Sequence, residues 1–473
     1  MSTFSPSTRV AALTLGLAAA LWVGLWAFAG LDSLISEDWY HLGIAAEERT
    51  WRAAFDVARV PLRPLQHFAF HALAQLDSPS PGAARLVGLG GHVVALFALY
   101  PLALRWIGDR RGALMALVLF ALAPNVFSVL SPAALGWPWR VAFSLLALLA
   151  FERYWSERRA GYAVAAIALW LVALGFHQGA LIVPGLAALR VLVLGDGDGR
   201  RRFDLSPGLV AWCALACGYV VYLLFVRDVT GHGLKEVATL PPNVVRASLA
   251  LFPEPLRIQA VAGLRADTLA CNVLGGVLLL VPLATFAWAL LFGSRLSKFI
   301  VLAIGLELLL PVLTTGFMSR YAYLGFALAA VGVAGVAHRG GAYVGAFWLT
   351  AVVWGLDCAR DADEFRCATA AAAELIDVAL EARERTPEGA IALVDVPERW
   401  GREQELNFFG IGLERALELS GGAGPWCVLR TWTTVYTTDV HAMAPEEIER
   451  REARGEFRAL RWDVVGERLV PAL

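Results

Sequence analysis

The sequence predicts an all-α polytopic membrane protein that carries a small α/β domain at its C-terminal end. Of the 473 residues, 58% are hydrophobic and 17% are charged, with a mean hydropathy of +0.59, whereas soluble domains average roughly 45–50% apolar residues. Apolar runs of roughly 17 to 25 residues, the length that crosses a bilayer, recur through the first three quarters of the chain. These observations exclude a single water-soluble enzyme and a disordered chain.

The charge balance divides the chain into two parts. From Asp357 to the end there are 14 arginines and 23 acidic residues, a net charge of −9, so the preceding part carries +8. That positive charge stands in short clusters at the ends of apolar runs, where membrane orientation places it, so nucleic acid is not expected as a partner. We therefore predict a transmembrane domain over residues 1–356 and a soluble domain over residues 357–473.

The apolar runs predict about eleven transmembrane helices. The first, over residues 10–31, follows Arg9 and is longer than the core of a signal peptide, so we expect an uncleaved span. The ten further spans are expected over residues 86–104, 112–130, 139–151, 160–176, 179–194, 208–226, 269–292, 299–314, 321–337 and 342–354.

Short basic loops between these runs indicate the orientation, because such loops remain in the cytoplasm. With a cytoplasmic N-terminus, all five basic loops fall on the cytoplasmic side, while the first loop (32–85), the long loop (227–268) and the soluble domain lie outside. In a bacterium this means the inner (plasma) membrane, with the C-terminal domain in the periplasm. The basic residues are Arg105, Arg110 and Arg111; Arg153, Arg158 and Arg159; Arg200 to Arg202; Arg295 and Lys298; His338 and Arg339.

The soluble domain is expected to be a small α/β unit. Its patterns predict helices over residues 364–385 and 406–419 and strands over residues 390–396, 427–436 and 457–463. It contains no nucleophile, metal or cofactor motif, so we expect a structural or acceptor-contacting module.

Three cysteines lie in this domain, on the face of the membrane where oxidation is permitted. Cys358 and Cys367 either close a short loop and leave Cys427 unpaired, or all three remain free thiols. The spacing leaves both alternatives open.

The first outer loop concentrates polar residues next to the first predicted span. The segment Ser36-Glu37-Asp38-Trp39-Tyr40 sets two adjacent carboxylates beside aromatic residues suited to the membrane interface. The alternative is a solvated turn after a helix end. Taken alone, the segment does not decide between a site and a turn.

Further along this loop, residues 65–76 predict an amphipathic helix that lies flat on the membrane. His67 and His71 share its other side with the i, i+4 spacing of metal ligands. Because no carboxylate or thiol is fixed beside them in the sequence, no metal site is expected, and a divalent cation remains an open alternative.

Five segments follow the order of motifs in one known family. They are Glu37-Asp38-Trp39-Tyr40, Arg63-Pro64-Leu65 opening the amphipathic helix, Leu89-Gly90-Gly91-His92, the stretch His177-Gln178-Gly179-Ala180-Leu181-Ile182-Val183-Pro184, and Arg320-Tyr321-Ala322-Tyr323-Leu324. The last two are similar to family patterns written KE-A---P and ERYLYL. Together the segments resemble the GT-C superfamily of membrane glycosyltransferases, and within it the O-mannosyltransferase-like type that uses polyprenyl- or dolichyl-phosphate sugars. The resemblance covers residues 10–340.

The resemblance implies transfer of a sugar from a polyprenyl-phosphate carrier in the bilayer to a hydroxyl of a glycan, lipid or protein acceptor on the outer face, without a cofactor. Such a transfer needs a base for the acceptor's proton and cations for the departing phosphate. Asp38 is then the expected base, and repulsion from the adjacent Glu37 should raise its pKa. The residues expected to bind the donor phosphate are Arg320, Tyr321, Arg63 and His177, with Arg140 as a weaker candidate.

Three alternatives stay open. Arg320 is equally compatible with a residue that snorkels to the membrane interface. A transporter or flippase of lipid-linked intermediates would also need outward cations, but it should bury ionisable residues inside its spans, where Glu307 is the only clear example. A noncatalytic scaffold on the same fold is the third, because the chain departs from the family patterns at Glu37-Asp38, at His177-Gln178 and at Ser319.

The predicted topology is testable with single cysteines in intact cells. Arg110→Cys, Arg158→Cys and Arg201→Cys should be shielded from an impermeant thiol reagent, because basic loops stay in the cytoplasm. Thr50→Cys and Glu388→Cys should react. Labelling of Arg158→Cys with none of Thr50→Cys would invert the topology and remove the first loop from the outer face.

Overall fold

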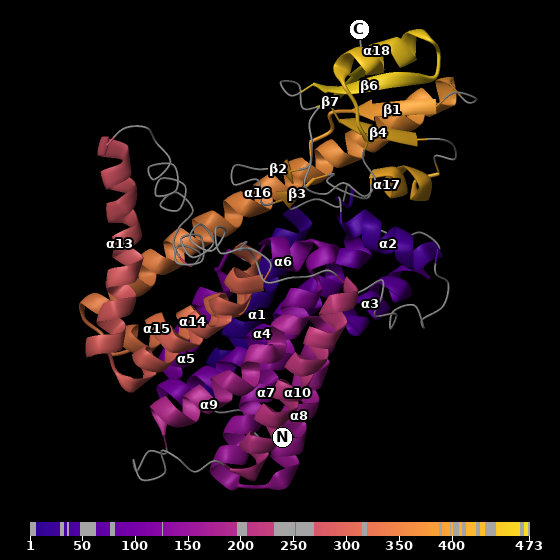
Figure 1. Cartoon of the computed structure of the whole chain (residues 1–473). Helices are drawn as coiled ribbons and strands as arrows, with labels where there is room; N and C mark the ends of the chain where they lie inside the picture. Colours follow the sequence, from indigo (N-terminus) through magenta and orange to yellow (C-terminus); the bar gives the residue numbers. More distant parts are fainter. Residues whose placement is uncertain are drawn as a thin grey trace.

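A computed structural model provides the fold of the chain (Figure 1). Most of the described residues are helical, and a five-stranded sheet lies near the C-terminal end. The structure describes residues 6–28, 33–35, 37–47, 63–75, 81–124, 126–195, 206–230, 251, 269–314, 319–386, 390–397, 399–400, 406–408, 413–421, 426–430, 441–463 and 468–471.

Every apolar run that was expected to cross the membrane overlaps a helix. Three stretches, Pro81–Ile107, Pro132–Glu157 and Ala342–Arg385, are long and apolar enough to cross a membrane within the described residues. This supports a multi-pass membrane protein, while the number of eleven spans remains a prediction. The helices are α1 (Pro6–Phe28), α4 (Pro81–Ile107), α5 (Arg110–Ala121), α6 (Val126–Leu130), α7 (Gly136–Glu157), α8 (Ala160–Phe176), α9 (Val183–Leu194), α10 (Pro207–Thr230), α13 (Leu269–Phe292), α14 (Arg295–Thr314), α15 (Tyr323–Ala337) and α16 (Ala342–Arg385).

The prediction of one continuous span over residues 112–130 is wrong. α5 ends at Ala121, and the short helix α6 begins at Val126. Pro124 lies between them. Proline has no N–H to continue a helix and disfavours helical backbone in the residue before it, so the run is divided here.

Short elements gather at one end of the bundle, which we call the loop end. α2 (Glu37–Glu47) and α3 (Pro64–Ala74) come from the first outer loop, and Figure 1 shows them beside each other. Three 3-10 turns precede long helices: η2 (Pro132–Ala134) before α7, η3 (Gln178–Ile182) before α9, and η5 (Ser319–Ala322) before α15. The first outer loop and these helix starts therefore share one end.

Polar side chains fasten the first outer loop to this end. Gln66 Nε2 of α3 donates to the carbonyl oxygen of Ala133 in η2 at 2.8 Å. Arg63 Nε donates to Gln178 Oε1 in η3 at 3.1 Å. The loop is thus held on the bundle by its own side chains as well as by apolar packing.

The basic loops lie together at the opposite end. A Cβ built on Gly112, at the start of α5, would lie 3.3 Å from the Cβ of His338, at the end of α15. Trp106 Nε1 donates to Glu152 Oε1 at 2.7 Å, which places the end of α4 beside the end of α7. Arg200 to Arg202 lie outside the described residues. A single basic end is what the charge rule expects, and the side of the membrane on which it lies stays a prediction.

One helix connects the transmembrane part to the tail. α16 has 44 residues, so the predicted boundary between residues 356 and 357 falls inside it. Its first part exposes large apolar residues such as Trp348 and Leu349, and its last part packs against the sheet. Figure 1 shows α16 running from the bundle to the C-terminal strands.

The alternative of a Cys358–Cys367 disulfide is wrong. Both cysteines are free, and both lie on α16, nine residues apart. A helix rises about 1.5 Å per residue, which separates them by about 13 Å, whereas a disulfide needs Cα atoms within about 7 Å. The side chain of Cys427 lies outside the described residues.

The tail contains a mostly parallel sheet with helices on both faces. The strand order is β5-β4-β1-β6-β7, with β1 parallel to β4 and β6, and β7 antiparallel to β6. One face packs against α18 and the other against α16 and α17. The elements are β1 (Ala390–Val394), β4 (Trp426–Arg430), β5 (His441–Ala442), β6 (Phe457–Asp463), β7 (Arg468–Pro471), α17 (Leu413–Leu419) and α18 (Pro445–Ala453).

The strand expected over residues 457–463 is confirmed as β6, and the one expected over residues 390–396 is confirmed as β1, which ends at Val394. The strand expected over residues 427–436 is confirmed up to Arg430 as β4, and its remainder lies outside the described residues. The helix expected over residues 406–419 is wrong in its first part, where β3 (Leu406–Asn407) pairs with β2 (Arg399–Trp400). Asparagine and the aromatic residues that follow it have low helix propensity. The helix therefore forms only further along, as α17.

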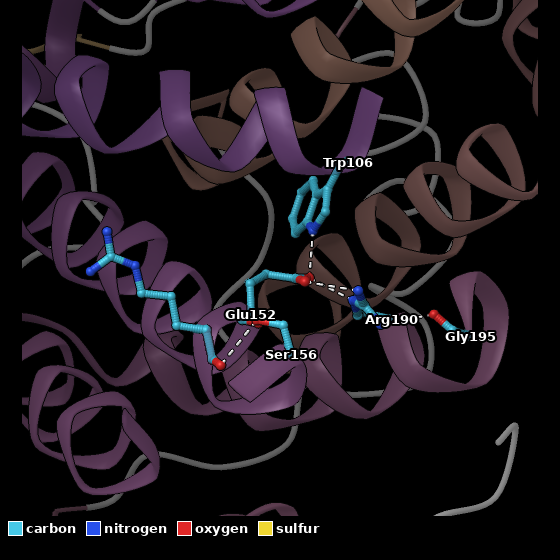
Figure 2. Close-up of polar contacts among 6 residues, drawn as sticks. Trp106, Glu152, Ser156, Arg190 and Gly195 are labelled. Carbon is cyan, nitrogen blue, oxygen red and sulfur yellow. Dashed lines mark hydrogen bonds and ion pairs between the residues drawn. The ribbon is translucent and has the colours of Figure 1, made fainter. Parts of the chain in front are cut away.

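A closed polar cluster joins three helices at the basic end (Figure 2). The buried Glu152 of α7 accepts the bond from Trp106 of α4, and it also accepts from Arg190 of α9, through Nε at 2.5 Å and Nη2 at 2.8 Å. Arg190 Nη1 donates to the carbonyl oxygen of Gly195, beyond the end of α9, at 3.1 Å. Both charges are compensated, so the cluster suits a purely structural role.

Removing the carboxylate from this cluster should destabilise the fold. Glu152→Gln leaves the Arg190 guanidinium without its counter-charge, and breaking a buried pair costs roughly 3–5 kcal/mol. We expect a lower midpoint of thermal unfolding in detergent. The matched control is Glu157→Gln, because Glu157 pairs with Arg159 on the surface, at 38% and 76% side-chain exposure, where a pair contributes little. Equal midpoints for Glu152→Gln and the control would contradict the stabilising role.

Candidate active site

Asp38 ties the first outer loop to the bundle. Its side chain is fully buried, and Oδ1 accepts hydrogen bonds from Ser131 Oγ at 2.9 Å and from the Ala133 N–H at 2.5 Å. Oδ2 accepts from the Ile35 N–H at 3.3 Å, while the Asp38 N–H donates to the Ile35 carbonyl at 2.8 Å. One carboxylate therefore caps the start of α2 and fastens it to η2.

Burial sets the charge state of this carboxyl. Loss of water raises the pKa of Asp38 to about 6, and the hydrogen bonds just described, together with the charge of Arg85, limit the rise. The sequence predicted a raised pKa through repulsion by Glu37, but the largest cause in the structure is burial. Glu37 begins α2, and its side chain lies outside the described residues.

Arg85 contacts the chain segment just before Asp38. It is fully buried, its Nη2 donates to the carbonyl oxygen of Ser33, and its guanidinium lies 5.2 Å from the ring centre of Phe365 in α16. On the other side, α17 of the tail packs on α2, where the Arg415 side chain lies over Gly43. The Asp38 segment is thus held between the bundle and the tail.

A helix is confirmed at the expected place as α3, but the histidines that were expected on the side away from the apolar face are turned inward. That this helix lies flat on the membrane stays a prediction. Phe68 is half exposed, whereas His67 and His71 are buried, and the His67 ring lies 5.4 Å from that of His41 in α2. Burial, followed by the charges of its neighbours, lowers the pKa of His67 to about 3, so this ring is neutral. Among the described residues, no three side chains of metal-ligating type gather into a site.

An aromatic cluster lies at the start of α7. The Trp137 ring is 3.8 Å from the ring centre of His177 and 5.0 Å from that of Tyr321. His177 Nδ1 accepts from the Gly179 N–H at 3.0 Å, so the proton of the neutral ring is on Nε2. Two residues expected to bind phosphate are brought together by a tryptophan that the sequence did not single out.

Arg63 reaches the same cluster from the start of α3. Its bond to Gln178 ties the start of α3 to the residue that follows His177. The backbone of Arg320 forms η5 beside Tyr321, and its side chain lies outside the described residues. His177 and Tyr321 therefore converge on Trp137, while Arg63 is connected to them through Gln178 and Arg320 through its place in the chain.

A buried polar cluster lies behind Trp137. The Arg140 guanidinium is 4.8 Å from the Trp137 ring, and its Nη2 lies 2.5 Å from Oε1 of Glu307 in α14. Tyr323 of α15 is within electrostatic range of Arg140, and its hydroxyl bonds to Nδ1 of His92 in α4. The sequence signal for this cluster was one arginine and one glutamate inside apolar runs, where ionisable residues are rarely tolerated without partners.

The Asp38 anchor and the aromatic cluster are continuous. η2, which receives the Asp38 carboxylate, is separated by Leu135 alone from Gly136 and Trp137 at the start of α7. A Cβ on Gly136 would collide with the Gln66 side chain and with the Phe176 carbonyl, so α3, α7 and α8 approach closely here. The structure thus gathers most of the predicted site residues at the loop end.

No protein-family model and no curated protein matches this chain. Among solved structures, it is similar to ArnT from Cupriavidus metallidurans bound to undecaprenyl phosphate, at 16% identity and a TM-score of 0.43, over 98% of this chain and 94% of that chain. It is likewise similar to ArnT from the same organism in the apo state, at 16% identity and a TM-score of 0.43, over 94% of this chain and 92% of that chain.

The raised pKa of Asp38 predicts a pH dependence of stability. A carboxyl whose pKa rises from 3.8 to about 6 on folding stabilises the fold most below about pH 4, and this contribution is lost as the pH rises through about 6. Two pKa units correspond to about 3 kcal/mol. The stability of the wild type should therefore fall relative to that of Asp38→Asn between about pH 4 and pH 7, measured by thermal unfolding in detergent. A difference that is constant over this range would contradict the shift.

Proposed function

We propose that this chain is an integral-membrane glycosyltransferase of GT-C type that moves a sugar from a polyprenyl-phosphate carrier to an acceptor hydroxyl on the outer face of the membrane. The observation that carries the proposal is the convergence of His177 and Tyr321 on Trp137, with Arg63 bonded to Gln178, the residue that follows His177. This cluster lies at the same end of an apolar bundle as Asp38. Cationic and hydrogen-bonding groups at the edge of a bilayer suit a donor whose lipid lies in the membrane and whose sugar lies outside.

The departing carrier is the part of the reaction that the convergent residues would serve. The acceptor oxygen attacks the anomeric carbon, the bond from that carbon to the phosphate oxygen breaks, and the carrier leaves as a phosphate with the electron pair. Arg63 would supply a permanent positive charge, His177 the N–H on Nε2, and Tyr321 a hydroxyl. Arg320, beside Tyr321, would add a second guanidinium. Fixed donors of this kind stabilise charge strongly where water is excluded.

Asp38 is the proposed base for the acceptor's proton. A pKa of about 6 keeps its carboxylate ionised at neutral pH while making it more basic than an ordinary aspartate, which suits general base catalysis. The same carboxylate anchors α2 to η2. Its chemical and structural roles therefore need to be separated by measuring activity and stability on the same variant.

We place the reaction in the inner (plasma) membrane, with the N-terminus in the cytoplasm and the C-terminal domain in the periplasm. α17 of the tail packs against α2, which carries Asp38. We therefore propose that the tail contacts the acceptor, a glycan, a lipid or a protein. No cofactor is required by this reaction, and a divalent cation is not part of the proposal.

The function is tested by offering membranes that contain the full chain a panel of polyprenyl-phosphate sugars labelled in the sugar. Label should appear in a glycan, lipid or protein fraction. The ionisable pair Arg140–Glu307 inside the bundle favours a flippase as the second candidate. A flippase would carry labelled donor across a vesicle bilayer without transferring the label. That result would contradict the glycosyltransferase and support the flippase.

The base is tested in the same assay. Asp38→Asn should lower sugar transfer by about 100-fold or more, the contribution of a positioned base, while the protein remains folded in the membrane. Glu37→Gln should lower it about tenfold if it shifts the pKa of Asp38 by one unit. Full activity of Asp38→Asn together with loss of activity in Glu37→Gln would show that Glu37 is the base and that Asp38 is not. Full activity of the double variant would exclude this loop from the chemistry.

A further inference from the structure

Arg140 and Glu307 form an ion pair inside the apolar bundle. Their side chains are 2% and 1% exposed, and Arg140 Nη2 lies 2.5 Å from Glu307 Oε1. Removing two charges from water costs about as much as their attraction returns, so such a pair is a poor device for stability alone. Stability alone therefore does not explain why an ion pair lies between α7 and α14.

The Arg140–Glu307 pair leaves part of its hydrogen-bonding capacity without a partner among the described residues. Arg140 Nε and Glu307 Oε2 make no hydrogen bond within the part of the chain that the structure describes, although both atoms are buried. The pair Glu152–Arg190 differs, because its carboxylate accepts from two atoms of one guanidinium and from Trp106. A guanidinium can bind an oxyanion through two parallel N–H groups, so Arg140 retains capacity for a further acceptor.

The incompletely hydrogen-bonded guanidinium of Arg140 lies beside the residues of the candidate site. Arg140 is the fifth residue of α7, which places its Cα about 6 Å from the loop end, within reach of an arginine side chain that extends towards the interface. Trp137, which covers the guanidinium at 4.8 Å, also contacts His177 and Tyr321. A Cβ on Gly179 would collide with Arg140 Nη1, so the glycine of the His177 segment is what lets η3 approach this cation.

We propose that Arg140 is a ligand of the carrier phosphate and that Glu307 competes with that phosphate for it. The inference rests on the proposed function and adds a third cation, after Arg63 and Arg320, to its phosphate site. Exchange of one anion for another keeps the guanidinium compensated, and the displaced Glu307 would take up a proton, because an unpaired charge is expensive in a medium of low dielectric. The competing carboxylate weakens the hold on the carrier, which must leave after each transfer.

This role predicts opposite effects from the two halves of one ion pair. Arg140→Gln should weaken binding of undecaprenyl phosphate about tenfold or more, the loss expected for a hydrogen bond to a charged group. Glu307→Gln should tighten binding about tenfold, because the competing anion is gone while the side chain keeps its shape. A pair that only supports the fold would change binding in the same direction in both variants.

The experiment titrates the purified full chain in detergent with undecaprenyl phosphate and measures the bound fraction by native mass spectrometry. The ligand control is undecaprenol, which lacks the phosphate. The matched protein control is Glu152→Gln at the other end of α7 (Figure 2), which breaks a buried pair far from the site and should bind as the wild type does. A loss of stability alone is thereby separated from a loss of phosphate recognition.

The outcomes are distinct. Opposite shifts in Arg140→Gln and Glu307→Gln support the inference, whereas equal affinities, or shifts in one direction, overturn it while leaving the proposed function standing. Wild-type protein that binds the alcohol and the phosphate equally overturns both. If a single variant does not fold, the neutral double variant Arg140→Gln/Glu307→Gln decides. Wild-type affinity for undecaprenyl phosphate in that variant would exclude Arg140 as a phosphate ligand. A loss of that affinity would support Arg140 as a ligand.

Discussion

The loop end of this protein depends on one buried carboxylate. Asp38 accepts hydrogen bonds from η2 and from the segment before α2, and so joins a loop element to the start of α7. α3 is packed on α2, and α17 of the tail packs on its other side. The position of the aromatic cluster around Trp137 relative to the outer loop therefore follows from where this carboxylate is held.

The two buried ion pairs of α7 show how the same chemistry serves different ends of a membrane helix. Near the basic end, Glu152 is saturated by Trp106 and Arg190, and three helices are locked together. Near the loop end, Arg140 and Glu307 share one short contact and each retains an unused atom within the described part of the chain. An ion pair whose buried polar atoms are all hydrogen-bonded suits stability. An ion pair that leaves buried polar atoms unbonded suits the exchange of one ligand for another, because such an atom is costly unless it acquires a partner.

The sequence predicted the helices well because apolar runs in a membrane must satisfy their own backbone, and it located β6 at its observed bounds. It did not predict the break at Pro124, nor that Cys358 and Cys367 would share one rigid helix. The contact between Arg140 and Glu307 joins residues 167 positions apart, and no local pattern encodes such a pairing. Long-range polar contacts are set by how helices pack, so a single sequence shows only that their members are unusual.

Asp38 illustrates why position in a loop was an incomplete guide to its environment. Adjacent carboxylates beside a predicted span left a site and a solvated turn as alternatives, whereas the structure buries Asp38 under η2, near the charge of Arg85. Arg85 in turn contacts Phe365 of α16, the helix that leads into the tail. The tail is therefore mechanically connected to the carboxylate through two side chains, and an acceptor that bound to the tail would act on the segment that carries Asp38. In this arrangement, the tail and the candidate site both contact the segment around Asp38.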